Sequence, residues 1–137
     1  MKKIFIICSK AFYKDIPPIK ERLELNGWEV FLPHTYENPN AENEWYAIGK
    51  EEHAKMKCEM FRKSRDRIKI MDAVLTLNFD KNGKKNYVGG STFLELYEAF
   101  MENKKIYLWN DVPDGILFDE ISAFSPIIIN GNLDIVK

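Results

Sequence analysis

The segment from Asp72 to Glu95 constrains the fold most strongly, because it passes from a strand pattern to a helix pattern through a polar loop. Residues 73–78 form a largely apolar run, which is typical of a strand buried on both faces. Gly89-Gly90 then precedes residues with helical spacing. Strand, loop, glycine turn and helix in this order indicate a parallel α/β sheet, whose ligands bind where loops leave the C-terminal ends of the strands.

The rest of the chain continues this alternation of strands and helices. Apolar, β-branched runs predict strands at residues 3–8, 28–32, 73–79, 105–109 and 127–129. A first helix is expected to begin after Asp15, a good N-cap, and to end at Asn26-Gly27. Further helices are expected at residues 48–70, 90–103 and 114–124, with a loop at 33–45. The apolar pattern of the helix at 90–103 consists of Phe93, Leu94, Tyr97 and Met101.

Such alternation predicts a parallel sheet that is covered by helices on both faces and built with right-handed crossovers. We expect one domain, residues 1–137, with a flavodoxin-like or Rossmann-like three-layer α/β sandwich of about five parallel strands in the order 2-1-3-4-5. This order places a topological switch point between strands one and three. The polar loops at residues 9–13 and 78–90 are therefore expected to share one cleft.

The composition of the chain argues against several classes of partner. Lys and Arg number 20 against 21 Asp and Glu, so the chain lacks the positive field that favours nucleic-acid binding, and we expect no nucleic-acid partner. No apolar run is long enough to cross a bilayer, so no membrane partner is expected. Cys8 and Cys58 form no metal or disulfide framework, which suits a reducing cytoplasm. We expect no metal and no cofactor.

Several motifs together resemble the nucleoside 2-deoxyribosyltransferase superfamily, which includes deoxynucleoside 5′-monophosphate N-glycosidases. They are Asp72 before the third strand, the glycine turn, Glu95 followed by Ala99, and the segment 103–108. The likeness extends over nearly the whole chain. It implies an enzyme that cleaves the N-glycosidic bond of a (deoxy)nucleoside or its 5′-monophosphate and passes the sugar to a base or to water. By motif match, Glu95 is the nucleophile at the anomeric carbon, and Asp72 assists at the base or the sugar hydroxyls.

The resemblance and the predicted cleft also indicate substrate-binding residues. An aromatic side chain after strand one, Tyr13 or Phe12, would contact the substrate. The N–H groups from Gly89 onward, with Ser91 and Thr92, would hold a 5′-phosphate or a ribose hydroxyl, because a helix N-terminus favours anions. The full set of candidate substrate-binding residues is Ser9, Lys10, Phe12, Tyr13, Asn78, Gly89, Gly90, Ser91 and Thr92.

Other interpretations of the same residues stay open. Thr92-Phe93-Leu94-Glu95 fits a capping box, in which the Glu only caps its own helix. Asp72 equally fits a solvated residue beside a strand, and the glycine pair fits a plain tight turn. The pattern Gly-Gly-x-Thr-x-x-Glu is also similar to lysine-decarboxylase-like phosphoribohydrolases. A third alternative is a nucleotide-binding or protein-interaction module without turnover. The resemblance further implies a homo-oligomer, with exposed aromatic residues near Trp45 or Trp109 as candidate contacts.

Overall fold

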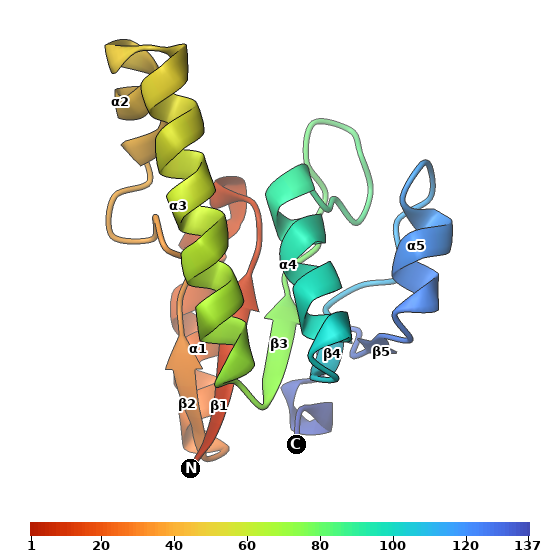
Figure 1. Cartoon of the computed structure of the whole chain (residues 1–137). Coiled ribbons are helices and arrows are strands. Elements are labelled where there is room, and N and C mark those ends of the chain that lie inside the picture. The colour runs from red at the N-terminus through yellow and green to blue at the C-terminus, as the bar shows by residue number, and fades with distance from the viewer.

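Five parallel strands form one sheet in the order β2-β1-β3-β4-β5, which confirms the predicted strand order. The computed structural model describes all 137 residues. The strands are β1 (Lys2–Ile7), β2 (Trp28–Phe31), β3 (Ala73–Thr76), β4 (Lys105–Leu108) and β5 (Ile127–Ile128). With helices on both faces of this sheet, the chain has the expected flavodoxin-like three-layer α/β fold (Figure 1).

The helices divide between the two faces of the sheet. They are α1 (Ile16–Leu25), α2 (Ala41–Ile48), α3 (Lys50–Lys69), α4 (Gly90–Met101) and α5 (Phe118–Ala123), with short 3-10 helices η1 (Lys10–Asp15) and η2 (Leu133–Ile135). One core cluster joins the sheet to α1 through Ile16 and Leu23. The other joins it to α3, α4 and α5 through Ile68, Leu96 and Ile121. None of the helices combines the length and the hydrophobicity that a membrane-spanning segment needs.

Alternation along the central strands explains why their sequences are apolar without interruption. In β1, Ile4 and Ile6 belong to the α1 cluster, whereas Phe5 and Ile7 belong to the α3–α4 cluster. These four side chains are almost completely buried. Successive side chains of a strand point to opposite faces, so a strand that is covered on both faces has no polar side.

The segment between β2 and α3 differs from the prediction. Residues 33–45 were expected to be a loop because they contain Pro33, Pro39 and several Asn, but the eight-residue helix α2 begins at Ala41. Ala41 is the only buried residue of α2. The helix packs on α3, and Figure 1 shows both at one end of the molecule. A helix with one buried residue has no apolar stripe by which its sequence could reveal it.

The connection from β1 to α1 is also more ordered than predicted. Residues 10–15 form η1, and the Ser9 hydroxyl at its start accepts a hydrogen bond from the Ala11 N–H at 3.3 Å. Asp15 does precede α1, but its side chain makes no capping hydrogen bond. Its backbone is already in the right-handed helical region, with φ −89° and ψ −10°. A capping side chain normally needs an extended backbone at that position, so the predicted cap is wrong.

The buried side of α4 differs from its predicted apolar pattern. Leu94, Tyr97 and Met101 are 44%, 45% and 55% exposed. The buried residues are instead Thr92, Leu96 and Ala99, spaced four and three apart. This spacing is that of one helical face. Glu95, three residues after Thr92, lies along the same inward stripe.

The two sides of α4 give a direct test of this assignment. Leu96→Ala should lower the free energy of unfolding by about 3 kcal/mol, because it leaves a cavity in the core. Leu94→Ala, on the outer side, should cost less than about 1 kcal/mol. Urea denaturation of the two variants and the wild type measures both values. Equal losses would contradict the orientation of α4.

Candidate functional site

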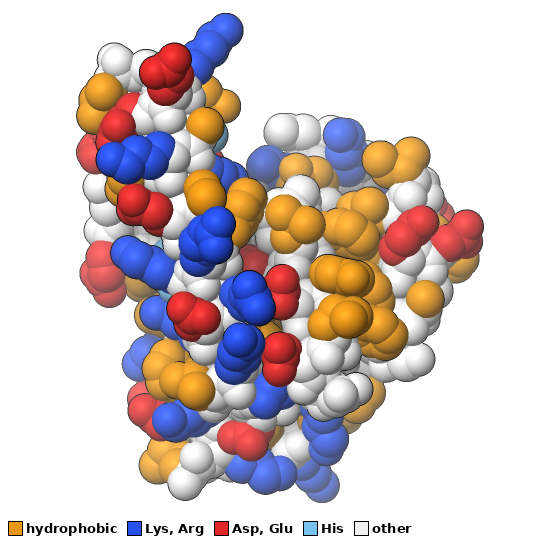
Figure 2. All heavy atoms as spheres, in the orientation of Figure 1, with side chains coloured by type: hydrophobic (Ala, Val, Ile, Leu, Met, Phe, Trp, Pro, Cys, Tyr) orange, Lys and Arg blue, Asp and Glu red, His pale blue; other side chains and the backbone are white.

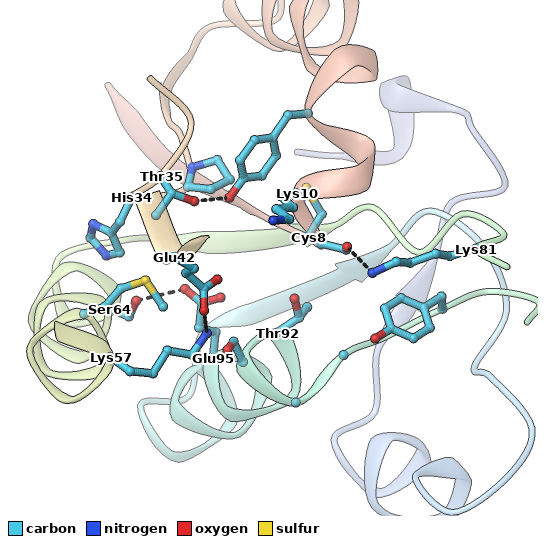
Figure 3. Close-up of a pocket in the computed structure, with 18 residues that line it drawn as sticks. Cys8, Lys10, His34, Thr35, Glu42, Lys57, Ser64, Lys81, Thr92 and Glu95 are labelled. Carbon is cyan, nitrogen blue, oxygen red and sulfur yellow. Dashed lines mark hydrogen bonds and ion pairs between the residues drawn. The ribbon is translucent and has the colours of Figure 1, made fainter. Parts of the chain in front are cut away.

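A mostly polar pocket lies at the C-terminal edge of the sheet, beside the switch point between β1 and β3. Its cavity is about 240 Å³, and only four of its 18 lining residues are hydrophobic. The lining comes from the segments that follow β1 and β2, from α2 and α3, and from the loop that leads into α4 (Figure 3). The predicted cleft between the loops after strands one and three is therefore present. A ligand that fills it would be polar and small.

Glu95 is the central carboxyl group of this pocket. Its side chain is half-buried, and the Ser64 hydroxyl on α3 donates a hydrogen bond to Glu95 Oε2 at 2.9 Å. Burial raises the pKa of Glu95 to about 7, although the Ser64 hydrogen bond and the charges of Arg67 and Lys57 oppose the rise. Near neutral pH the carboxyl is thus divided between its protonated and ionised forms.

The structure decides against the capping-box interpretation of Glu95. Helix α4 begins at Gly90 and Gly89 occupies the N-cap, so Thr92 lies inside the first turn. A capping box needs the Thr at the N-cap and the Glu three residues later, at the third helical position. The Glu95 carboxylate receives its hydrogen bond from another helix instead. A carboxyl group in a pocket whose pKa is shifted by burial, and which does not cap its own helix, is a candidate catalytic residue.

One end of the pocket gathers positive charge. Lys81, from the loop between β3 and α4, donates a hydrogen bond to Ser9 Oγ at 3.1 Å, and its ammonium lies 4.7 Å from the centre of the Tyr87 ring. Lys10 also lines the pocket. Gly89 and Gly90 bring the N-terminus of α4 to the same end. Together these groups can hold an anion.

At one of the two positions of the glycine turn, a steric contact explains why the residue is glycine. A Cβ atom at Gly89 would lie 3.1 Å from the Tyr87 hydroxyl, closer than nine in ten real Cβ contacts. A Cβ at Gly90 would meet nothing within 4 Å. Gly89 therefore lets Tyr87 fold over the start of α4. Sequence reasoning found the glycines but missed Lys81 and Tyr87, whose places depend on the path of the loop.

The other end of the pocket contains an ion pair between α2 and α3. Lys57 Nζ donates a hydrogen bond to Glu42 Oε1 at 2.8 Å, and His53 Nε2 lies 3.2 Å from the same oxygen. Burial alone would raise the pKa of Glu42, but the hydrogen bonds and charges of Lys57 and His53 outweigh it and hold that pKa below its usual value. Sequence reasoning missed Glu42 because α2 was expected to be a loop.

Tyr13, Thr35 and His34 form an uncharged wall of the pocket. The hydroxyl groups of Tyr13 and Thr35 share a hydrogen bond of 2.8 Å. Burial raises the pKa of Tyr13 to about 12, although the bond to Thr35 opposes this. Burial and the charges of Arg67 and Lys63 lower the pKa of His34 to about 4, so its imidazole is neutral. Its Nε2 is buried without a hydrogen-bond partner.

Cys8 lines the same pocket but is no nucleophile. Burial, with smaller effects of the Glu95 and Asp15 charges, raises the pKa of Cys8 to about 12. The thiol therefore keeps its proton at neutral pH, and a protonated thiol is unreactive. Cys8 acts as a small buried residue at the end of β1.

Asp72 lies outside the pocket, so its predicted role beside Glu95 is wrong. It directly precedes β3, and its Oδ2 accepts a hydrogen bond from the backbone N–H of Lys3 at 2.8 Å. Lys3 belongs to the start of β1, so Asp72 marks the N-terminal edge of the sheet, whereas the pocket lies at the C-terminal edge. Asp72 is exposed and ties the entry of β3 to β1.

Phe12 and Asn78 also differ from their predicted roles in substrate binding, because neither lines the pocket. Phe12 is buried in the core, where its ring packs edge-to-face against the ring of Phe79 with 5.2 Å between the ring centres. Asn78 is buried and holds the loop after β4, accepting a hydrogen bond from Asn110 N at 2.8 Å and donating to the carbonyls of Asn110 and Asp111. The remaining candidates, Ser9, Lys10, Tyr13, Gly89, Gly90, Ser91 and Thr92, do line the pocket.

The chain contains no group of three or more His, Cys, Asp or Glu side chains arranged to hold a metal ion. A scan of the chain against protein-family models finds no match, and a search of the curated proteins finds none either. The assignment of a function therefore depends on the geometry and charges of the pocket and on the motifs described above.

The raised pKa of Glu95 predicts how stability depends on pH. Between about pH 4.5 and pH 7 the unfolded chain ionises Glu95 while the folded chain keeps the proton, so the carboxyl lowers stability progressively through this range. Glu95→Gln removes the effect. From pH 5 to pH 8 the free energy of unfolding of this variant should therefore rise relative to that of the wild type, by at most about 3 kcal/mol. Its melting temperature should rise relative to the wild type over the same range.

Thermal unfolding of both proteins at several pH values measures this difference. Glu98→Gln, on the same helix but outside the pocket, is the matched control and should follow the wild type. A constant gap between Glu95→Gln and the wild type would show that the Glu95 carboxyl is not shifted by burial.

Proposed function

We propose that this chain is a cytoplasmic enzyme that cleaves the N-glycosidic bond of a (deoxy)nucleoside or its 5′-monophosphate, with Glu95 as the nucleophile. The observation that carries the proposal is the Glu95 carboxyl itself, half-buried in a polar pocket at the switch point and bound by Ser64 at 2.9 Å. The resemblance of the motifs around Glu95 to the nucleoside 2-deoxyribosyltransferase superfamily supports it.

The reaction would proceed in two displacements. An ionised Glu95 oxygen bonds to the anomeric carbon while the carbon–nitrogen bond breaks, and the departing base keeps the electron pair and takes a proton from solvent. Water or a second base then attacks the same carbon, loses a proton, and releases the Glu95 carboxylate. Developing oxocarbenium charge is stabilised by the carboxylate in both steps. Water as acceptor makes the enzyme a hydrolase, and a free base makes it a transferase.

Ser64 and the burial of Glu95 would serve this reaction in different ways. The Ser64 hydroxyl binds Oε2, which fixes the carboxylate plane and leaves Oε1 free to attack. A carboxylate whose pKa is raised to about 7 is more basic than an ordinary one, and thus more nucleophilic once ionised. Lys57 and Arg67 favour the ionised form. Ser64 is accordingly a positioning residue.

Base release provides the test of this function. Ribo- and deoxynucleosides and their 5′-monophosphates are incubated with the wild type and with Glu95→Gln, with and without a competing free base, and the products are separated by chromatography. The wild type should release base at a rate that rises with pH through about 7, because the ionised carboxyl is needed. Glu95→Gln should lower the rate by at least about a thousandfold.

Two outcomes would contradict the proposal. Full activity in Glu95→Gln would remove Glu95 as the nucleophile. No base release from any substrate by the folded wild type would favour a nucleotide-binding module without turnover. A new nucleoside formed only in the presence of free base would identify a transferase.

We also propose that the enzyme is a homo-oligomer whose contact surface is the outer side of α4 and α5. Hydrophobic side chains gather over these two helices in Figure 2. They include the exposed residues Leu94, Tyr97, Phe100, Met101 and Phe118. An apolar patch of this kind is typical of a protein interface. Trp109, near which contacts were expected, does not belong to this patch: it is half-buried and packs on the core cluster of the α1 face, beside Phe79.

The molecular mass in solution tests this surface. Light scattering after size-exclusion chromatography should give a multiple of 16.1 kDa for the wild type and a smaller mass for Tyr97→Glu. Tyr46→Glu, at an exposed tyrosine of α2, is the matched control and should keep the wild-type mass. A monomeric wild type would contradict the homo-oligomer.

A further inference from the structure

The charged groups of the pocket separate into two ends. Lys81 and the N-terminus of α4 lie at one end, Glu42 with its partner Lys57 lies at the other, and Lys10 lines the pocket between them. Figure 3 shows Lys81 and Glu42 on opposite sides of the cavity. A ligand that satisfied both ends would need an anionic group at one side and hydrogen-bond donors at the other.

Lys81 has a charge that the chain itself leaves unpaired. The four ion pairs of the chain involve Lys20, Arg22, His53 and Lys57, and neither Lys81 nor Lys10 contacts a carboxylate within 4.0 Å. Lys81 is instead held by a neutral hydroxyl, Ser9 Oγ, and by the face of Tyr87. A cation fixed in this way beside a helix N-terminus attracts an anion, and most strongly a phosphate, whose several oxygens can accept from both.

Glu42 offers the opposite chemistry. Both of its partners, Lys57 and His53, contact Oε1, whereas Oε2 accepts no hydrogen bond from the chain. The carboxylate is ionised at neutral pH, because the two partners hold its pKa below the usual value. An ionised carboxylate only accepts hydrogen bonds. Its ligand must therefore present an N–H or O–H group.

Glu95 lies within reach of both ends. Ser91, at the start of α4, precedes it by one helical turn, or about 6 Å along the axis. On the other side, Lys57 binds Glu42 directly and its charge acts on Glu95. The reacting carbon would thus lie between the anion and the donor groups, as the anomeric carbon does between the phosphate and the base of a nucleotide.

We propose that the pocket binds a nucleoside 5′-monophosphate in one orientation, with the phosphate at Lys81 and the N-terminus of α4 and an amino-bearing base at Glu42. This inference takes the substrate class from the function proposed above and adds the phosphate and the amino group to it. Adenine, guanine and cytosine carry an exocyclic amino group that can donate to Glu42. Thymine carries no exocyclic amino group, and its one ring N–H, at N3, lies between two carbonyl oxygens that would repel the Glu42 carboxylate, so its monophosphate binds more weakly.

Titration calorimetry on Glu95→Gln measures binding without turnover. The ligands are the deoxynucleoside 5′-monophosphates of adenine, guanine, cytosine and thymine, the four matching nucleosides, and inorganic phosphate. At least one monophosphate with an amino-bearing base should bind tenfold or more tightly than its own nucleoside. The same monophosphate should also bind tenfold or more tightly than thymidine monophosphate.

Further variants in the Glu95→Gln background assign the two ends. Lys81→Met should weaken monophosphate binding about tenfold and leave nucleoside binding unchanged. Lys85→Met, on the same loop but outside the pocket, should change neither. Glu42→Gln should remove the preference for amino-bearing bases, while Glu44→Gln, an exposed residue of the same helix, should keep it. Melting temperatures confirm that each variant is folded.

Equal affinity for nucleosides and monophosphates, or an unchanged affinity in Lys81→Met, would overturn the inference. Equal affinity for thymidine monophosphate and the other monophosphates would overturn the assignment of Glu42. Base release by the wild type would still support the proposed function in these cases. Conversely, oriented binding that depends on Lys81 and Glu42, without base release, would keep the inference and remove the proposed function.

Discussion

The position of β1 in the sheet determines where this protein can hold a ligand. β1 pairs with β2 on one side and with β3 on the other, and both of its faces are buried. The chain leaves β1 and β3 at the same edge, and the segments that follow them diverge to opposite faces of the sheet. A hollow between these segments follows from the strand order alone. The pocket is thus a consequence of how the apolar strands are paired.

Glu95 is a carboxyl group on the inward-facing side of a helix, and its surroundings reduce the free-energy cost of placing it there. It shares the inward side of α4 with Thr92, Leu96 and Ala99, where an ionised carboxylate is costly. The Ser64 hydroxyl and the nearby charges reduce that cost without removing it, because the pKa stays near 7. Stability and the proposed chemistry therefore oppose each other at this residue, and a purely structural role would favour an apolar side chain.

The sequence predicts the sheet better than it predicts the pocket, for a physical reason. Apolar runs and glycine turns are local signals, so the five strands, their order and the start of α4 could be predicted. Lys81 and Tyr87 reach the pocket through the path of a loop, and Glu42 through a helix with one buried residue, neither of which has a periodic signal. Asp72 was misplaced by motif likeness, although its position before a strand already favoured the opposite edge of the sheet.

The absence of Asp72 from the pocket changes the chemistry that the site can support. With Asp72 remote, Glu95 and Glu42 are the only carboxylates that line the cavity, and Glu42 is bound to Lys57. Tyr13, whose pKa is raised to about 12, is too weak an acid to protonate a departing base efficiently. In the proposed reaction the protein therefore supplies the nucleophile, Glu95, whereas solvent supplies the proton that the departing base takes up. Bases that depart easily, with little need of a proton donor, would suit such a site best.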